Sequence, residues 1–79
     1  MKIELRVLGP NQTEVCLGRN MLFFSYGTVV AALIGQHWHV TDKKHSRTTK
    51  KHINRYFGEF KDFCYTPQEY LEAMVDKLV

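Results

Sequence analysis

Apolar and charged residues alternate at the start of the chain, and this pattern sets the kind of fold available to it. Ile3, Leu5 and Val7 are separated by single charged residues. Because successive side chains of a strand point to opposite faces, the period of two predicts a strand over residues 2–8 with one face buried and the other in water. The same period predicts a second strand over residues 12–18.

Turn-forming residues stand between and after these two strands. Gly-Pro-Asn occupies positions 9–11, and Gly-Arg-Asn occupies positions 18–20. Gly and Asn tolerate a positive φ and Pro has a fixed φ, so both triplets predict tight turns. The first two strands should therefore form a hairpin that continues into a third strand.

Two further strands are expected before the middle of the chain. The aromatic and β-branched segment 21–33 favours one long strand, in which Gly27 would mark a bulge or bend. Gly35 then turns the chain. The alternation over residues 37–42 predicts a fourth strand with Trp38 facing the core.

The second half of the chain carries helix signals. Ser46 is a suitable N-cap for a helix over residues 47–58, in which apolar side chains recur at i, i+3, i+4 and i+7. Thr66 is followed by Pro67 and, three positions after the Thr, by Glu. This combination of N-cap, first-turn proline and capping box predicts a second helix over residues 67–78.

These elements together predict an α+β fold. We expect one domain over residues 1–79, built as a two-layer sandwich in which a four-stranded antiparallel sheet carries both C-terminal helices on one face. A hydrophobic fraction of 44% is that of a folded domain. One shared core should contain Trp38, Ile53, Phe57, Leu71 and Val75.

Positive charge is concentrated in one region of the chain. Residues 43–61 hold seven Lys and Arg against a single Glu, whereas residues 1–42 are neutral and residues 62–79 carry an excess of negative charge. The formal net charge of +3 therefore conceals a basic patch. Such a patch points to an anionic partner, either nucleic acid or an acidic protein.

Basic residues align on one side of the first predicted helix. Arg47, Lys51 and Arg55 are spaced i, i+4 and i+8, opposite the apolar face. Like charges at this spacing repel by roughly 0.3 kcal/mol per pair, which a bound anion would relieve. The helix N-terminus after Ser46 adds N–H groups suited to a phosphate. The predicted nucleic-acid-binding residues are Lys43, Lys44, Arg47, Lys50, Lys51 and Arg55.

The simpler interpretation of these cations is a solvated helix face. Glu59 follows Arg55 by four residues and would partly offset its charge. Both interpretations place the cations in water, so the sequence leaves them open.

No catalytic motif emerges from the spacing of reactive residues. His37 and His39 share a strand face and could reach one Zn²⁺ together, but no spacing supplies a third ligand, so no metal or cofactor is predicted and binding by the two histidines stays open. Cys16 and Cys64 lack the local pattern of an activated nucleophile, and the chain has no Gly-rich phosphate loop or Ser elbow. We expect that the protein is not an enzyme.

Several features bear on location. The first residues alternate in polarity and lack the continuous apolar stretch of a signal peptide. The longest apolar run, residues 29–34, is far shorter than the roughly 20 residues needed to cross a bilayer. Two cysteines are too few for the disulfide framework of a small secreted domain. We therefore expect a cytoplasmic protein with reduced thiols and no membrane partner.

Two segments resemble motifs of a known family. They are LFFSYGTVVA at residues 22–31 and SRTTKKHIN at residues 46–54. Both are similar to the strand and helix start of a family of small, mostly phage-encoded proteins without assigned function. That family commonly has a proline where this chain has Val29, which suggests a less bent strand here. The resemblance implies a phage or viral accessory protein rather than a metabolic enzyme.

The expected function combines the basic patch with this resemblance. We expect a non-catalytic phage or viral accessory protein whose basic helix contacts nucleic-acid phosphates in the cytoplasm of the host cell. The alternative is a protein–protein interaction module that modulates a host factor through an edge strand or through the same basic face. Pairing of two chains through an edge strand would give a homodimer.

Overall fold

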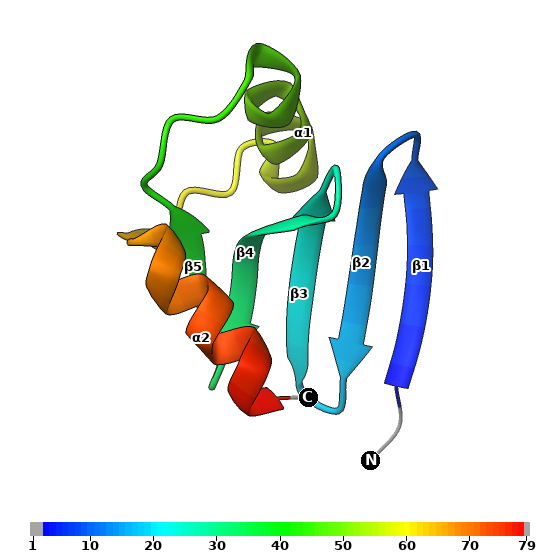
Figure 1. The fold of residues 1–79 in the computed structure, drawn as a ribbon, viewed down its shortest axis with the longest axis vertical. Helices are drawn as coiled ribbons and strands as arrows, with labels where there is room; N and C mark the ends of the chain where they lie inside the picture. The colour runs from blue at the N-terminus through cyan, green and yellow to red at the C-terminus, as the bar shows by residue number, and fades with distance from the viewer. Residues whose placement is uncertain (1–2, 79) are drawn as a thin grey trace.

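The computed structural model describes residues 3–78, whose regular elements are six strands and two helices (Figure 1). The strands are β1 (Ile3–Gly9), β2 (Gln12–Leu17), β3 (Asn20–Ser25), β4 (Thr28–Ile34), β5 (His37–Thr41) and β6 (Phe63–Thr66). The helices are α1 (Arg47–Phe57) and α2 (Gln68–Leu78). The predicted first strand began at residue 2, which lies outside the described residues.

The described strands form one sheet in sequence order, β1-β2-β3-β4-β5-β6. β1 to β5 are an antiparallel meander joined by tight turns, and β6 pairs parallel to β5. A parallel pair needs a crossover connection, and α1 supplies it. The α+β class is therefore confirmed, but the sheet has six strands and a mixed direction instead of the four antiparallel strands that we expected.

The long strand predicted over residues 21–33 is a hairpin. β3 ends at Ser25 and β4 begins at Thr28, with Tyr26 and Gly27 between them at φ of 53° and 78°. Positive φ at both central residues is typical of a type I′ turn, which matches the twist of the flanking strands. Gly27 does mark a bend, as predicted, but this bend is a turn that reverses the chain. The prediction of one long strand was wrong, because β propensity does not show where a strand reverses.

β6 was not predicted from the sequence. It is four residues long and ends at Thr66, immediately before the start of α2. A strand this short has no periodicity to detect. It forms because the crossover through α1 returns the chain to the free side of β5, where Trp38 lies opposite Phe63.

The helices begin close to their predicted signals. Ser46 caps α1 by accepting the Thr49 N–H at 3.2 Å. α1 ends at Phe57, and the Gly58 N–H donates to the Asn54 carbonyl at 2.8 Å. Gly58 has a positive φ of 58°, which glycine adopts without steric cost. Neither described helix is long and apolar enough to cross a membrane.

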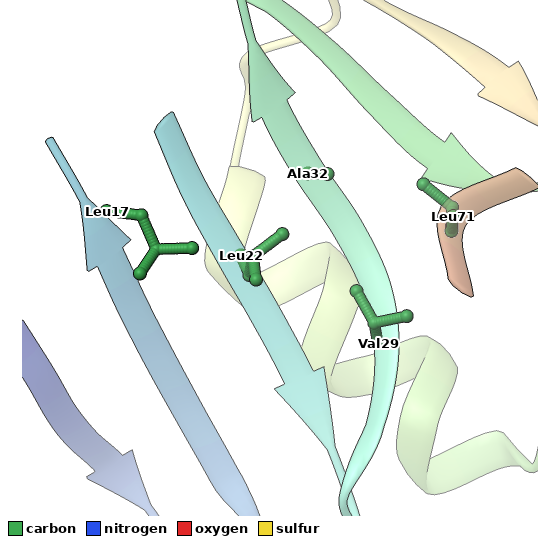
Figure 2. Close-up of a cluster of buried hydrophobic side chains, with 5 residues drawn as sticks. All are labelled: Leu17, Leu22, Val29, Ala32 and Leu71. Carbon is green, nitrogen blue, oxygen red and sulfur yellow. The ribbon is translucent and has the colours of Figure 1, made fainter. Parts of the chain in front are cut away.

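The two helices contact opposite faces of the sheet. Leu22 and Phe23 are neighbours in β3, so their side chains point to opposite sides. Leu22 packs in a cluster with Leu71 of α2, whereas Phe23 lies in a second cluster against which Tyr56 of α1 packs. Figure 2 shows the first cluster, with α1 behind the strands. Both helices were expected on one face, and this part of the prediction does not hold.

The sheet therefore separates two clusters of buried side chains. On the α2 face they are Leu17, Leu22, Val29, Ala32 and Leu71 (Figure 2). On the α1 face they are Phe23, Val30, Ala31 and Val40. The five residues expected to share one core are divided, with Leu71 and Val75 on the first face and Trp38, Ile53 and Phe57 on the second.

β1 carries an apolar side that the described residues leave exposed. Ile3, Leu5 and Val7 are 64%, 65% and 74% exposed. In the β1–β2 register they share the face of Val15 and Leu17, but α2 contacts that face over β4 and β5 (Figure 1). The expected burial of this side was wrong, because alternation specifies which residues share a face and not whether a helix covers it.

Tyr56 anchors α1 to the centre of the sheet. Its ring stacks on Phe23 with centroids 4.1 Å apart, and its hydroxyl donates to the Glu14 carboxylate. Glu14 is 5% exposed, and its second oxygen lies 3.7 Å from the Arg6 guanidinium. Burial of the phenol, followed by its bond to Glu14, raises the pKa of Tyr56 well above its ordinary value. A buried carboxylate is tolerated here because it has these two partners.

Gly27→Ala tests the β3–β4 turn. A Cβ at Gly27 would meet no atom within 4 Å, so the substitution acts through the backbone alone. An Ala in the left-handed region costs about 1 kcal/mol, and the free energy of unfolding measured with urea should fall by about that amount. Gly27→Asn is the control and should cost less, because Asn tolerates this conformation. An Ala variant as stable as the parent would contradict the turn assignment.

Tyr56→Phe tests the anchor of α1. It leaves Glu14 buried with one donor fewer, so the free energy of unfolding at neutral pH should fall by about 1–3 kcal/mol.

The folded-state pKa of Tyr56 is raised above the unfolded value of 10.0, so the stability that its proton contributes is complete below that pH and is lost above it. The parent should therefore lose stability above pH 10 more steeply than Tyr56→Phe. Tyr70→Phe, at a tyrosine that is 61% exposed, should change neither quantity.

Candidate nucleic-acid interface

A chain of four polar side chains connects the β3–β4 hairpin to α1. Ser25 Oγ lies 3.0 Å from Thr49 Oγ1 and 2.8 Å from His52 Nδ1. Ser46 Oγ lies 3.3 Å from Thr49 Oγ1. Ser25 and Thr49 are 1% and 5% exposed, so water does not compete for these bonds. The contacts fix how α1 is rotated about its own axis, and they decide which of its side chains face solvent.

Ser46 donates to Thr49, and Ser25 links Thr49 to His52 Nδ1 through one hydrogen bond to each. The Nε2 atom of the ring is not used by these bonds. The Tyr26 ring stacks on the His52 ring with centroids 5.7 Å apart, which holds the imidazole from the other side.

An open groove of about 480 Å³ lies between α1 and the β1–β2 turn. Its lining residues are Pro10, Gln12, Thr48, Lys51, His52, Asn54 and Arg55. Two of them are cations and four carry neutral side chains with hydrogen-bonding groups. No carboxylate belongs to this lining in the part of the chain that the structure describes. The groove is therefore suited to an anion.

The structure brings part of the predicted site together at this groove. Lys51 and Arg55 lie one helical turn apart and both line it. All six predicted cations are exposed. The other four are outside the lining: Lys43 and Lys44 lie in the loop before α1, and Arg47 and Lys50 lie in its first turns. They extend the basic surface over the first turns of α1 and the loop before it.

Within residues 3–78, none of the six cations lies within 4.0 Å of a carboxylate, whereas Arg6 and Glu14 do form such a pair. Glu59 was expected to offset Arg55 one helical turn earlier. This expectation was wrong, because α1 ends at Phe57 and Glu59 lies beyond the helix. The charge of the basic surface is thus left for solvent or for a ligand.

The N-terminus of α1 contributes less than the sequence suggested. The Ser46 hydroxyl occupies the Thr49 N–H, which is therefore not available to a phosphate. The site depends instead on side chains along the exposed side of α1.

Sequence reasoning missed the role of His52 and the contribution of Gln12. Gln12 comes from the start of β2, far from α1 in sequence, so no local pattern connects the two. His52 had a signal. It lies in segment 46–54 and Ser25 lies in segment 22–31, and these are the two segments on which the resemblance rested. The structure shows that they meet through the bond between Ser25 and His52.

The histidines do not gather into a metal site among the described residues, where no three His, Cys, Asp or Glu side chains cluster suitably. His39 Nδ1 lies 3.0 Å from Thr66 Oγ1 and 3.3 Å from Cys64 Sγ. His45 Nε2 lies 3.1 Å from Gln68 Oε1. Cys64 faces His39 because β6 pairs with β5, and this thiol–imidazole contact was missed because β6 was not predicted. Both cysteines are free thiols.

The fold and the groove define a small α+β domain with a basic helix on one face of a mixed sheet. A family model described as "Family of unknown function (DUF8033)" matches residues 3–73. The chain belongs to this family. No curated protein and no solved structure matches it.

Ser25→Ala tests the contact that orients α1. The variant removes the hydroxyl that joins Thr49 to His52 and leaves both without this partner. The free energy of unfolding should fall by about 1–3 kcal/mol, and amide hydrogen exchange in α1 should accelerate. Thr48→Ala, at an exposed position of the same helix, should change stability by no more than about 0.5 kcal/mol. Equal stability of Ser25→Ala and the parent would contradict the role given to Ser25.

Proposed function

We propose that this chain is a non-catalytic accessory protein of the kind encoded by phages, and that α1 binds the phosphates of nucleic acid. One observation carries the proposal. Lys51 and Arg55 line an open groove that contains no carboxylate among the described residues, and within residues 3–78 none of the six predicted cations pairs with a carboxylate. Cations in such an arrangement attract the phosphate backbone of any sequence.

Each side chain of the groove has a physical role in this proposal. Lys51 and Arg55 neutralise phosphate charge, and the Arg guanidinium can bind two phosphate oxygens at once. Thr48 and Asn54 flank them on α1 and can donate hydrogen bonds to phosphate or sugar oxygens. His52 lines the groove beside them and adds a ring nitrogen capable of hydrogen bonding. Contacts of this kind position a protein on nucleic acid without reading its bases, so we expect modest affinity and little sequence preference.

The contact between Ser25 and His52 has the atoms of a nucleophile–base pair, but its surroundings favour a structural role. Ser25 is 1% exposed, and its hydroxyl also bonds Thr49. A serine nucleophile must reach its substrate, which this hydroxyl cannot do without a change in the fold. We therefore propose that the pair orients α1 and does no chemistry.

The proposed origin and location come from the sequence resemblance. The segments at 22–31 and 46–54 resemble those of a mostly phage-encoded family. A phage accessory protein with a basic helix would meet its ligand in the cytoplasm of the host, where nucleic acid is accessible. An acidic host protein is the alternative ligand for the same cations, and the following test separates the two.

The combined substitution Arg47→Gln, Lys51→Gln and Arg55→Gln tests the proposal. The parent should bind duplex DNA with a log–log salt slope of roughly −3 to −5, as expected for about three to five neutralised phosphates. The triple variant should lose most of this binding in fluorescence anisotropy at low salt. Its free energy of unfolding should stay within about 1 kcal/mol of the parent, because the three positions are exposed.

The matched control removes the same charge elsewhere. Its three exposed substitutions are Arg19→Gln, Lys61→Gln and Lys77→Gln. If α1 is the binding surface, this control binds nearly as well as the parent. Equal loss in both triple variants would mean that total charge and not the groove drives binding. A parent that binds neither DNA nor RNA at low salt would refute the proposal and favour an acidic protein partner.

A further inference from the structure

We propose that two copies of this chain pair through β1 and join their sheets into one continuous sheet across a two-fold axis. β1 lies at the edge of the sheet order and has β2 as its neighbour in the described chain. An edge strand leaves a row of N–H and C=O groups without strand partners, which can pair with another strand. The inference concerns a surface separate from the groove and does not depend on the proposed function.

The first five residues of β1 lack the features that protect most edge strands from pairing. Proteins usually blunt an edge with Pro, Lys, a bulge or a covering segment. The regular part of β1, residues 3–7, contains neither Pro nor Lys, and its register shift lies beyond this part, between Val7 and Gly9. Three apolar side chains of this part, Ile3, Leu5 and Val7, are 64–74% exposed. An exposed, regular and apolar edge is a surface that favours strand pairing.

The sequence of β1 is complementary to itself. When two copies run antiparallel about Leu5, each Ile3 lies opposite Val7 and each Glu4 lies opposite Arg6 of the other copy. The two Leu5 side chains then face each other. Apolar pairs and opposite-charge pairs across neighbouring strands both stabilise a sheet.

Other registers lose this match. A shift of the partner by two residues places Glu4 opposite Glu4, or Arg6 opposite Arg6, and like charges directly opposite are destabilising. A shift by one residue places apolar side chains opposite charged ones on both faces. The charge pattern therefore favours one register of the two strands. It also favours a second copy of this chain as the partner of β1, because a two-fold interface requires a self-complementary surface.

The proposed pairing keeps the two helices α1 on the same side. Arg6 lies 3.7 Å from Glu14, which bonds Tyr56 of α1, so the charged side of β1 belongs to the α1 face. Residues opposite each other in neighbouring strands share a face. Both basic grooves then open on one face of the joined sheet, and both apolar sides of β1 meet on the other face.

Leu5→Lys tests the pairing, because it places two lysines opposite each other on the two-fold axis. The parent should elute with about twice the 9.3 kDa chain mass in size exclusion with light scattering at up to about 0.1 mM. Leu5→Lys should be monomeric or weaken the dimer by at least about tenfold. Leu5 is 65% exposed within one chain. The circular dichroism spectrum and Tm of the variant should therefore stay close to those of the parent diluted until its dimer dissociates.

Tyr65→Lys is the matched control at the opposite edge of the sheet. Tyr65 is 70% exposed and lies in β6, so this lysine should leave the dimer unchanged. A monomeric parent would overturn the proposal. A dimer that Tyr65→Lys breaks and Leu5→Lys does not would overturn it as well, because that result assigns the contact to β6.

Cysteine cross-linking tests the register in the background Cys16→Ser, Cys64→Ser. Thiols in Leu5→Cys would lie directly opposite each other, and oxidation should give a disulfide-linked dimer. Thiols in Val7→Cys would be offset by four residues, about 13 Å along the strand, and should not link. Mixing Val7→Cys with Ile3→Cys should restore linkage between unlike chains. Linkage of Val7→Cys alone, as efficient as that of Leu5→Cys, would overturn the proposed register.

Discussion

The buried hydroxyl of Ser25 determines how α1 sits on the sheet, and the orientation of the basic surface follows from this contact. Ser25 is the last residue of β3, so its position depends on the tight turn at Tyr26 and Gly27. Its bonds to Thr49 and His52 hold one side of the helix against the sheet. The stacking of Tyr56 on Phe23 holds the next turn. With two sides of α1 fixed, the cations have no orientation available except towards solvent and the groove.

The two faces of the sheet are used differently. α1 covers one face through aromatic packing and a short polar chain, and it leaves a basic surface outside. α2 covers the other face over β4 and β5 and leaves the apolar side of β1 exposed. The proposed ligand surface and the proposed self-pairing edge therefore lie on different elements. Charge changes on α1 and apolar changes on β1 can be separated, because residues without shared partners act nearly independently.

The two segments on which the sequence resemblance rests meet in space. One ends β3 and forms the turn, and the other caps and begins α1. Their contact is a set of buried hydroxyl and imidazole bonds, which cost free energy when they are left unmade. Each segment therefore supplies the partner that the polar groups of the other require.

The sequence by itself determined what depends on neighbouring residues. Period-two alternation placed β1 and β2, Ser46 located the start of α1, and the clustering of Lys and Arg identified a basic helix. The tertiary structure decided everything that depends on distant pairing. The reversal at Tyr26, the strand β6, the division of the helices between two faces and the groove that Gln12 shares with Lys51 and Arg55 were not visible in any local pattern. The physical reason is that hydrogen bonds between strands and the burial of a sheet face require segments that are distant in the sequence. Local propensity does not specify which segment pairs with a strand or covers a face.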